Sequence, residues 1–531
     1  MKGFWDSMKF KNIKFLFIIF VILIVIFAIF KVNSKNNKKQ VNDISVESKE
    51  IVYQESIRLG ISNVNSVNPL ITRNKQLIDI YQLVYEPLLT LDENYRLNNC
   101  LATECAKTSA TTYIVKVDDS IKWSDGTKLS AKDVKYTVEL LKSKDNIFSE
   151  NVKNIESVEA IDDKTVKFNL SEETYFFEYN LIFPIMSEKY YNNDDFFSSA
   201  KCAIGTGPYK VSSISDTQID LEKNENYRNT EKINKNVNHI SIAIFSEIGE
   251  VYNSFKMGNI DVMSTSNILY ENYIGTMGYY TKEFKGREYD FLSFNCKDVL
   301  LSEKSVRQAI GFAIDKDNIV STIYNNKYYP SEYVLDYGSF TYSSNHASSG
   351  YNPEKAKEVL TNDGWVYTNN RWRKNGRILS VTISVNASNE QRCEVADNIK
   401  NQLENIGIQV NVWKVSDGQY MSYLNNKNYQ ILLTGVYNSY SPELTYFYGK
   451  DNISNYYNED VELLIEDVKN ITDEKLLLEK YKTLISITKD ECPYVSICRN
   501  KNFMLINQNV VGNFEPTNYG GFRNFWTWNR E

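Results

Sequence analysis

The chain offers few side chains for catalysis or metal binding. Its two histidines, His239 and His346, lie in a strand-like run and in a Ser/Asn-rich loop. None of the seven cysteines forms a C-x-x-C pair, although Cys492 and Cys498 are close enough in sequence to bridge. The sequence therefore contains too few histidines to favour a histidine-based metal centre or a Ser-His or Cys-His nucleophile. Carboxylate neighbours such as Asp118-Asp119 are typical of solvated turns. We therefore expect no enzyme: no catalytic residue, no metal ligand and no cofactor.

Composition favours a globular protein of more than one domain. A chain of 531 residues is too long for one core, so roughly two or three domains are expected. Hydrophobic residues make up 42% and charged residues 24%, which excludes a disordered chain. The net charge of −7 argues against a nucleic-acid partner. The 38 tyrosines and 26 phenylalanines suit both cores and ligand clefts.

Two segments share a strand–helix–strand pattern, which is typical of βαβ units in a parallel sheet. The segments consist of His239–Phe245, Glu247–Met257 and Ile260–Met263, and of Ser380–Asn386, Glu390–Asn405 and Ile408–Val415. Between them lies a strand at Tyr289–Phe294 and a helix at Ser302–Ala313 with Ser302 as its N-cap. The polar Asn295–Asp298 in between is interpreted as a crossing point between two α/β sheets. Two such lobes would leave a cleft, a favoured place for ligands.

Shorter signals place further elements. Leu77–Tyr85 is helical and ends before Pro87, and Ser130 with Asp133 forms a capping box. Asn352 caps a helix whose first position is proline. The aromatic tail 513–528 is expected to pack back on the first lobe.

The N-terminus predicts a membrane anchor. Residues Phe15–Phe30 are unbroken apolar and flanked by lysines, and 16 residues span about 24 Å, to which Ile13 and Val32 add. We place the span at about 14–31 as an uncleaved signal-anchor, because no small-x-small cleavage site follows it. A cleaved signal peptide is the alternative. Lysines on both sides leave the orientation undecided. Residues up to 50 are polar and indicate a tether.

Nine or so short motifs, in this order, resemble the family 5 extracellular solute-binding proteins of ABC transporters, the oligopeptide, dipeptide and nickel class. The motifs run from about Val52 to the C-terminus: Asn68-Pro-Leu70, Tyr85-Glu-Pro-Leu-Leu89, Trp123-Ser-Asp-Gly-Thr127 with Ala131-Lys-Asp-Val134, Gly205-Thr-Gly-Pro-Tyr-Lys210, Gly258-Asn-Ile-Asp261, Phe294-Asn295, Val306-Arg-Gln-Ala309 with Ala313-Ile-Asp-Lys316, Tyr351-Asn-Pro353 and Cys492-Pro-Tyr494.

The resemblance implies an α/β, periplasmic-binding-protein-like two-lobed fold of type II with an inserted α+β domain, here preceded by one transmembrane helix. The implied boundaries are 52–92, 203–292 and 504–531 for lobe I, 93–202 for the inserted domain, and 293–503 for lobe II. It also implies ligand capture between the lobes by a monomer, no nucleic-acid partner, and delivery to a membrane permease.

Two departures from the family pattern bear on anchoring and on the ligand. The family is usually held by a lipidated cysteine, but no cysteine precedes Cys100. Peptide binders of this type often carry Gly-Trp-x-x-Asp-Tyr, whose aspartate receives the peptide's amino terminus. Here Leu433–Tyr440 stands in that place, with Val436 for the tryptophan and Ser439 for the aspartate. A hydroxyl cannot supply the missing counter-charge unless Asp417 or Glu443 takes over.

The expected function is that of a single-pass, membrane-tethered extracellular protein that binds a peptide or similar small solute. Alternatives are the same fold with an oligosaccharide or modified peptide, and a tethered sensor or adhesion protein that does not transport. Backbone hydrogen bonds and aromatic walls would recognise the solute. The candidate ligand residues are Trp413, Tyr437, Ser439, Tyr440, Asp417 and Glu443, and core packing is an equally good interpretation of each aromatic one.

Overall fold

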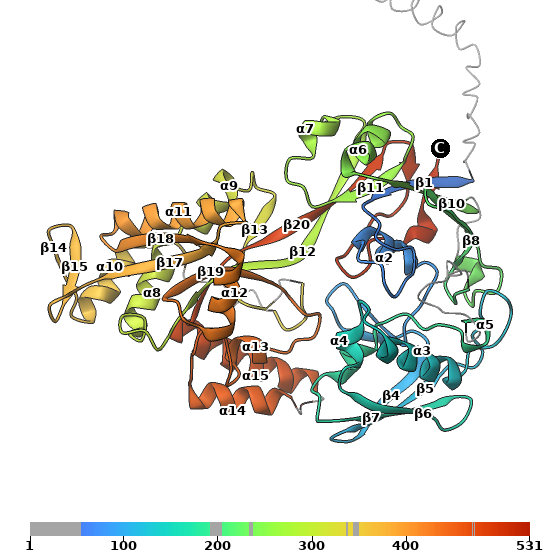
Figure 1. The fold of residues 1–531 in the computed structure, drawn as a ribbon, viewed down its shortest axis with the longest axis horizontal. Helices are drawn as coiled ribbons and strands as arrows, with labels where there is room; N and C mark the ends of the chain where they lie inside the picture. Colours follow the sequence, from blue (N-terminus) through green and yellow to red (C-terminus); the bar gives the residue numbers. More distant parts are fainter. Residues whose placement is uncertain are drawn as a thin grey trace, which may run out of the picture. The chain divides into compact units, whose positions relative to one another are not determined.

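The structure is a computed structural model that describes residues 55–191, 204–232, 237–335, 338–342, 350–469, 471 and 473–531 (Figure 1). All of them belong to one compact unit, Gln54–Glu531. The predicted span at 14–31, the tether and His346 lie outside the described residues. Within the described residues, no helix is long and apolar enough to cross a membrane.

One large mixed sheet runs through the described part of the chain. Its strands follow the order β18-β17-β19-β12-β20-β11-β1-β10-β9-β8, and β13 adds to β20. The strands are β1 (Ser56–Ser62), β8 (Tyr209–Ile214), β9 (Gln218–Lys223), β10 (His239–Phe245), β11 (Val262–Thr265), β12 (Tyr279–Phe294), β13 (Tyr328–Pro330), β17 (Ser380–Asn386), β18 (Gln409–Val415), β19 (Ile431–Tyr437) and β20 (Tyr494–Asn507).

The antiparallel pair β12 and β20 joins the two halves of this sheet (Figure 1). The first half of β12 lies beside the part of β20 that pairs with β11, and its second half, from Glu288, pairs with β19. The expectation of two separate sheets with a crossing at Asn295–Asp298 is therefore wrong. The crossing lies earlier, inside β12, because a 16-residue strand is long enough to serve both halves.

Both predicted βαβ units are present. The strands β17 and β18 pair in parallel on either side of α11 (Glu390–Asn405), and β10 and β11 both pair in parallel with β1 and flank α6 (Ile248–Lys256). Asn389 caps α11, and Gly407 (φ +88°) follows its end. The other helices over these sheets are α2 (Lys75–Tyr81), α7 (Glu271–Ile274), α8 (Lys304–Ala313), α9 (Lys316–Thr322) and α10 (Pro353–Asn362).

Three local predictions need correction. Ser302 does not cap α8, because its hydroxyl donates to Val299 O in the preceding turn, and Glu303 is the N-cap. The helix α2 begins one residue after its cap Asn74 and ends at Tyr81, short of the predicted Tyr85. The Cys492–Cys498 bridge is absent, since all the described cysteines are free thiols and Cys498 sits inside β20.

A four-stranded antiparallel sheet lies apart from the large one (Figure 1). It orders as β4 (Ala102–Ser109), β5 (Thr112–Val117), β7 (Thr165–Leu170) and β6 (Ile155–Ala160), with the helices α3 (Ala131–Ser143), α4 (Ser149–Val152) and α5 (Glu188–Tyr191). The predicted capping box is present, since Ser130 N donates to Asp133 Oδ2 at 2.8 Å. The buried residues of this four-stranded sheet join those around β1 and β10 in one continuous hydrophobic cluster.

The short strands β2 (Leu89–Leu91) and β3 (Leu97–Asn99) pair with each other and precede the four-stranded sheet in the chain. The elements of the far half and the C-terminus are α12 (Asp417–Asn426), α13 (Thr445–Tyr448), α14 (Glu459–Val468), α15 (Glu474–Glu491), and the short strands β14 (Val366–Thr368), β15 (Arg371–Lys374), β16 (Arg377–Ile378), β21 (Val510–Val511) and β22 (Asn529–Arg530).

The C-terminal tail packs where the aromatic pattern predicts. Phe522, Phe525 and Trp528 are buried in the cluster around β1. The fully buried carboxylate of Asp261 pairs with Arg58 of β1 at 2.7 Å and with Arg530 at 3.1 Å, which ties the two ends of the described chain together. The lobe boundaries stay a prediction.

A bulge marks the place where β12 crosses between the halves. Its pairing with β20 shifts register between Lys285 and Tyr289. Asn500 of β20 reaches into this bulge, and its Oδ1 accepts a hydrogen bond from Glu288 N at 3.0 Å. A Cβ on Gly286 would lie 1.9 Å from that Oδ1, so only glycine leaves room for the amide.

Replacing Gly286 by alanine should therefore lower the free energy of unfolding by about 1–3 kcal/mol, because the methyl group and the Asn500 amide cannot share the space. Urea unfolding of the wild type, Gly286→Ala, Asn500→Ala and the double variant measures this. The cost of the methyl should shrink by at least about 1 kcal/mol when Asn500 is already alanine. Gly418→Ala is the matched control, since its Cβ meets nothing within 4 Å. Equal costs in both backgrounds would contradict the proposed clash.

Candidate functional site

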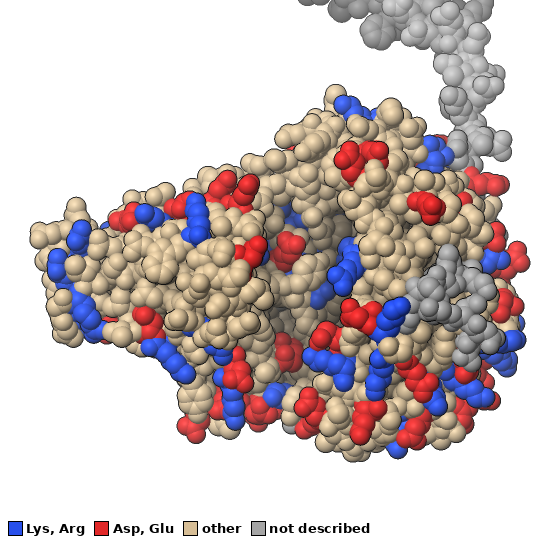
Figure 2. Space-filling view, viewed as in Figure 1, with Lys and Arg blue, Asp and Glu red and all other residues tan. Residues whose placement is uncertain are grey.

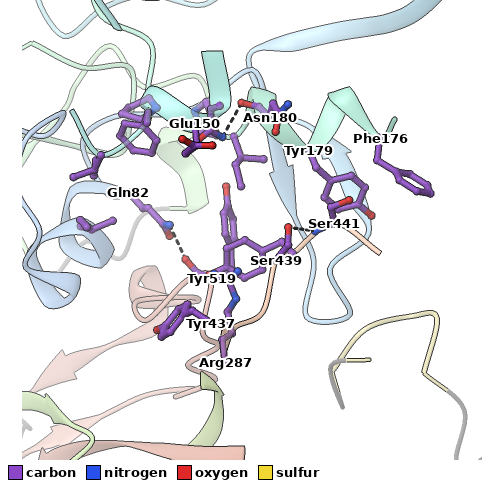
Figure 3. Close-up of a pocket in the computed structure, with 18 of the residues that line it drawn as sticks. Gln82, Glu150, Phe176, Tyr179, Asn180, Arg287, Tyr437, Ser439, Ser441 and Tyr519 are labelled. Carbon is purple, nitrogen blue, oxygen red and sulfur yellow. Dashed lines mark hydrogen bonds between the residues drawn. The ribbon is translucent and has the colours of Figure 1, made fainter. Parts of the chain in front are cut away.

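A cavity with a volume of about 650 Å³ lies at the end of β19. Figure 3 shows its lining side chains, which come from chain segments far apart in sequence. They are residues of α2 and the turn after it, residues between Ile147 and Pro184 beside the four-stranded sheet, Arg287 of β12, Tyr437 to Glu443 after β19, and Tyr519 of the tail. Figure 2 shows a hollow in this face of the described part, with charges of both signs along it.

The segment after β19 is held by hydrogen bonds within itself and to the tail. Ser439 Oγ accepts a hydrogen bond from Ser441 N at 3.1 Å (Figure 3). The Tyr440 hydroxyl donates to Asn518 O at 3.0 Å. Glu443 accepts a hydrogen bond from Thr445 N at the start of α13. These contacts fix the backbone while the Ser439 side chain stays exposed.

Tyr440 stands at the centre of the cavity's aromatic wall. Its ring meets Tyr95 edge-on at 5.2 Å and Tyr519 edge-on at 5.4 Å between centroids. Arg287 stacks over it, with Cζ 3.6 Å from the ring centroid, and lies 5.1 Å from the centroid of Tyr437. Aromatic faces held in this way offer flat contact surface at small entropic cost.

Asp79 of α2 is the most deeply placed carboxylate in the cavity wall. It is 7% exposed, forms an ion pair with Lys75, and lies against Gly521 of the tail. Burial raises the pKa of the Asp79 carboxyl from 3.8 to about 6, although Lys75 and the Gly521 backbone amide work in the opposite direction. Desolvation of the charged form therefore outweighs the partly exposed lysine.

A second cavity, of about 560 Å³, adjoins the first and shares Lys75, Asp79 and Tyr437 with it. Its wall is rich in side-chain amides, contributed by Asn63, Asn74, Gln76, Asn267, Asn500, Asn502 and Asn518. Asn518 is 2% exposed, and its Nδ2 has no hydrogen-bond partner in the described part of the chain. Each amide carries both donors and an acceptor, so this wall suits neutral groups that do the same.

A third cavity lies elsewhere and shares no lining residue with these two. It has a volume of about 400 Å³ and is enclosed by α8, α15 and β20. Its buried Lys316 pairs with Glu332 at 3.2 Å, and burial lowers the pKa of that lysine. None of the candidate ligand residues lines it, so we take the paired cavities as the functional site.

The structure brings four of the six candidate residues together. Tyr437, Ser439, Tyr440 and Glu443 line the cavity of about 650 Å³. Trp413 and Asp417 do not. Trp413 lies on β18, the strand at the end of the sheet, and is 56% exposed. Asp417 begins α12, and hydrogen bonds from the Asn386 and Ser388 side chains lower its pKa.

Sequence reasoning missed the charged residues of the wall. The predicted helix Leu77–Tyr85 includes Asp79 but begins after Lys75, and Arg287 lies just before the predicted strand Tyr289–Phe294. One usable signal was present, since Gly286-Arg287 interrupts the alternating pattern at the bulge. No group of three or more His, Cys, Asp or Glu residues within the described ranges could hold a metal ion.

The pKa of Asp79 predicts a pH dependence of stability. Between about pH 4 and pH 6 the Asp79 carboxyl holds a proton in the folded chain but not in the unfolded chain. The free energy of unfolding therefore falls as the pH rises through this range. Asp79→Asn removes the cost of the buried charge, which is at most about 3 kcal/mol for a shift of two units. The variant should gain stability over the wild type at pH 8 but not at pH 4. Urea midpoints at both pH values decide this, and Asp417→Asn serves as the exposed control.

The comparisons with known proteins agree on one family. The model for the bacterial extracellular solute-binding proteins, family 5 (Middle) matches residues 96–458. The chain is similar to the oligopeptide-binding protein AppA of Bacillus subtilis (strain 168), with 24% identity over 470 residues that cover 84% of this chain and 86% of AppA.

Solved structures show the same fold. A structure of AppA from Bacillus subtilis in complex with a nonapeptide has a TM-score of 0.61 and 22% identity, and covers 90% of this chain and 100% of that chain. A nickel ABC transporter structure from Bacillus halodurans reaches a TM-score of 0.79 at 17% identity, with 90% and 100% covered. The α/β fold is thus that of type II periplasmic binding proteins. The chain belongs to the bacterial extracellular solute-binding proteins of family 5, the peptide and nickel type of ABC transporters.

Proposed function

We propose that this chain is a membrane-tethered extracellular protein that captures a peptide or a similar small solute and delivers it to an ABC permease. The carrying observation is the cavity of about 650 Å³ whose wall combines α2, the region beside the four-stranded sheet, and the segment after β19. A site assembled from separate parts of the fold can trap a solute when those parts close on it. The chain binds and releases this solute as a monomer, without catalysis.

The proposed function uses the division of the chain into two lobes and an inserted domain that the family resemblance implies. Lobe I comprises 52–92, 203–292 and 504–531, the inserted domain 93–202, and lobe II 293–503. Each of them supplies part of the cavity wall, for example Asp79, Tyr179 and Tyr440. Closure bends β12 and β20 at the bulge beside Gly286, because the ladder of hydrogen bonds is already interrupted there.

A peptide fits the chemistry of the paired cavities. Its backbone repeats a donor and an acceptor at every residue, which the amide wall of the second cavity can satisfy. Tyr437 and Tyr440 provide flat surfaces for side chains of many kinds. The relative AppA, whose structure holds a nonapeptide, supports this choice.

Ser439 favours a second candidate ligand. It cannot neutralise the ammonium group of a free amino terminus, and Glu443 already accepts a hydrogen bond from Thr445 N. A modified peptide or an oligosaccharide therefore remains the alternative, since sugar hydroxyls also pair with amides and stack on aromatic rings. A tethered sensor would use the same cavity without a permease.

Calorimetric titration with three probes distinguishes these ligands. The probes are randomised pentapeptides with free amino termini, the same peptides N-acetylated, and a mixture of oligosaccharides. We expect binding of at least one peptide pool together with a smaller radius of gyration in solution scattering. Tyr437→Ala should weaken that binding about tenfold, while Trp413→Ala, outside the cavity, should leave it unchanged. No binding of any probe and no contraction would refute solute capture.

Membrane attachment through residues 14–31 can be tested separately. Because an uncleaved apolar span stays in the bilayer, the full chain should sediment with membranes and resist alkaline extraction. A chain that begins at residue 51 behind a cleavable signal peptide should appear in the medium. An N-terminal sequence of the mature protein that starts beyond residue 31 would show that the anchor is removed.

A further inference from the structure

We propose that Arg287 binds a carboxylate of the solute, so that the site selects solutes carrying a free acid group. This inference rests on the proposed function and names the chemistry of its ligand. It concerns a side chain that none of the sequence motifs includes.

Arg287 is placed by the crossing of β12. It follows Gly286 at the bulge, where the ladder with β20 is interrupted, and so its side chain leaves the sheet and enters the cavity (Figure 3). Its guanidinium plane stacks over Tyr440, at 3.6 Å from Cζ to the ring centroid. One nitrogen, Nη2, donates to Asn438 O. The stacking on Tyr440 and this hydrogen bond fix the orientation of the Arg287 guanidinium.

The charge of Arg287 has no partner among the described residues. The other two cations of the cavity wall are matched, since Lys75 pairs with Asp79, and Lys153 pairs with Glu150 at 2.6 Å. No carboxylate lies within 4.0 Å of Arg287 in the described ranges, and its buried Nε finds no acceptor there. Half-buried arginines elsewhere are satisfied, as Arg392 is by Asp290 at 2.7 Å and Arg228 by Glu86 at 2.6 Å.

A guanidinium that is partly removed from water and lacks a counter-charge binds an anion strongly, because its N–H groups can donate hydrogen bonds to it. A carboxylate matches its planar fork with two parallel hydrogen bonds, which are about twice as strong as neutral ones. It also supplies the charge that the cavity wall lacks. Phosphate has the same oxygen chemistry, and the experiment must separate the two.

The neighbouring groups favour an acid over an ammonium group at this place. Ser439 carries no charge, and Asp79 is paired with Lys75. The carboxylate of Glu443 accepts a hydrogen bond from Thr445 N. Arg287 is thus the cation of this wall that has no ion pair among the described residues. A solute acid group fits this balance better than a second cation does.

The test uses the full chain in detergent and two pentapeptide libraries, one with free carboxyl termini and one with carboxamides. The wild type should bind the acids at least about tenfold more tightly than the amides. Arg287→Gln should reduce acid binding to the level of the amides and leave amide binding unchanged. Arg287→Lys should retain only part of the preference, because it keeps the charge and loses the fork. Lys414→Gln, which removes an ion-paired cation outside these cavities, should keep the full preference.

A second measurement does not depend on peptides. Glutarate should raise the melting temperature of the wild type, whereas glutaramide should not, and Arg287→Gln should abolish the effect. Inorganic phosphate is the competing arm: stabilisation by phosphate and not by glutarate would overturn the choice of a carboxylate. If neither library binds but glutarate still acts through Arg287, peptide capture is wrong and the carboxylate site stands. Equal binding of acids and amides by the wild type, or a preference that survives in Arg287→Gln, overturns the proposal.

Discussion

The pairing of β12 with β20 is the constraint on which the rest of the structure depends. These two strands alone connect the half of the sheet that contains β11 and β1 with the half that contains β19 and β17. A continuous ladder would make this connection stiff. The register shifts at Lys285–Tyr289, where the Asn500 amide fills the space over Gly286, and at Asp290–Phe291 lie within a few residues of each other. The irregularities of this ladder are therefore confined to a short stretch of the crossing.

The same joint supplies chemistry to the cavity. A bulge turns one side chain out of the alternating pattern of a strand, and here that side chain is Arg287. On the neighbouring strand, Gly435 leaves room for the ion pair of Arg392 with Asp290, since a Cβ there would lie 2.0 Å from Arg392 Nη2. Gly435 thus leaves room for Arg392, which is paired within the protein, and Gly286 lies at the bulge from which Arg287 enters the cavity.

Local patterns predicted most of the elements but not their assembly. Periodicity located α11 at Glu390–Asn405 and both βαβ units, because those signals lie within a few residues of one another. The single sheet was missed, since the length of β12 depends on the pairing with β20, about 200 residues further on. The site divided in the same way: Tyr437 to Glu443 form one segment that a motif can mark, whereas Asp79 and Arg287 join it only through tertiary contacts.

Charge balance in the cavity wall bears on the serine at position 439. Ser439 lines the same cavity as Arg287 and carries no charge, so it cannot neutralise the guanidinium. Asp79 is paired with Lys75 and so leaves the charge of Arg287 unmatched. The proposed carboxylate site follows from this balance, because Arg287 is the cation of the wall that has no ion pair among the described residues.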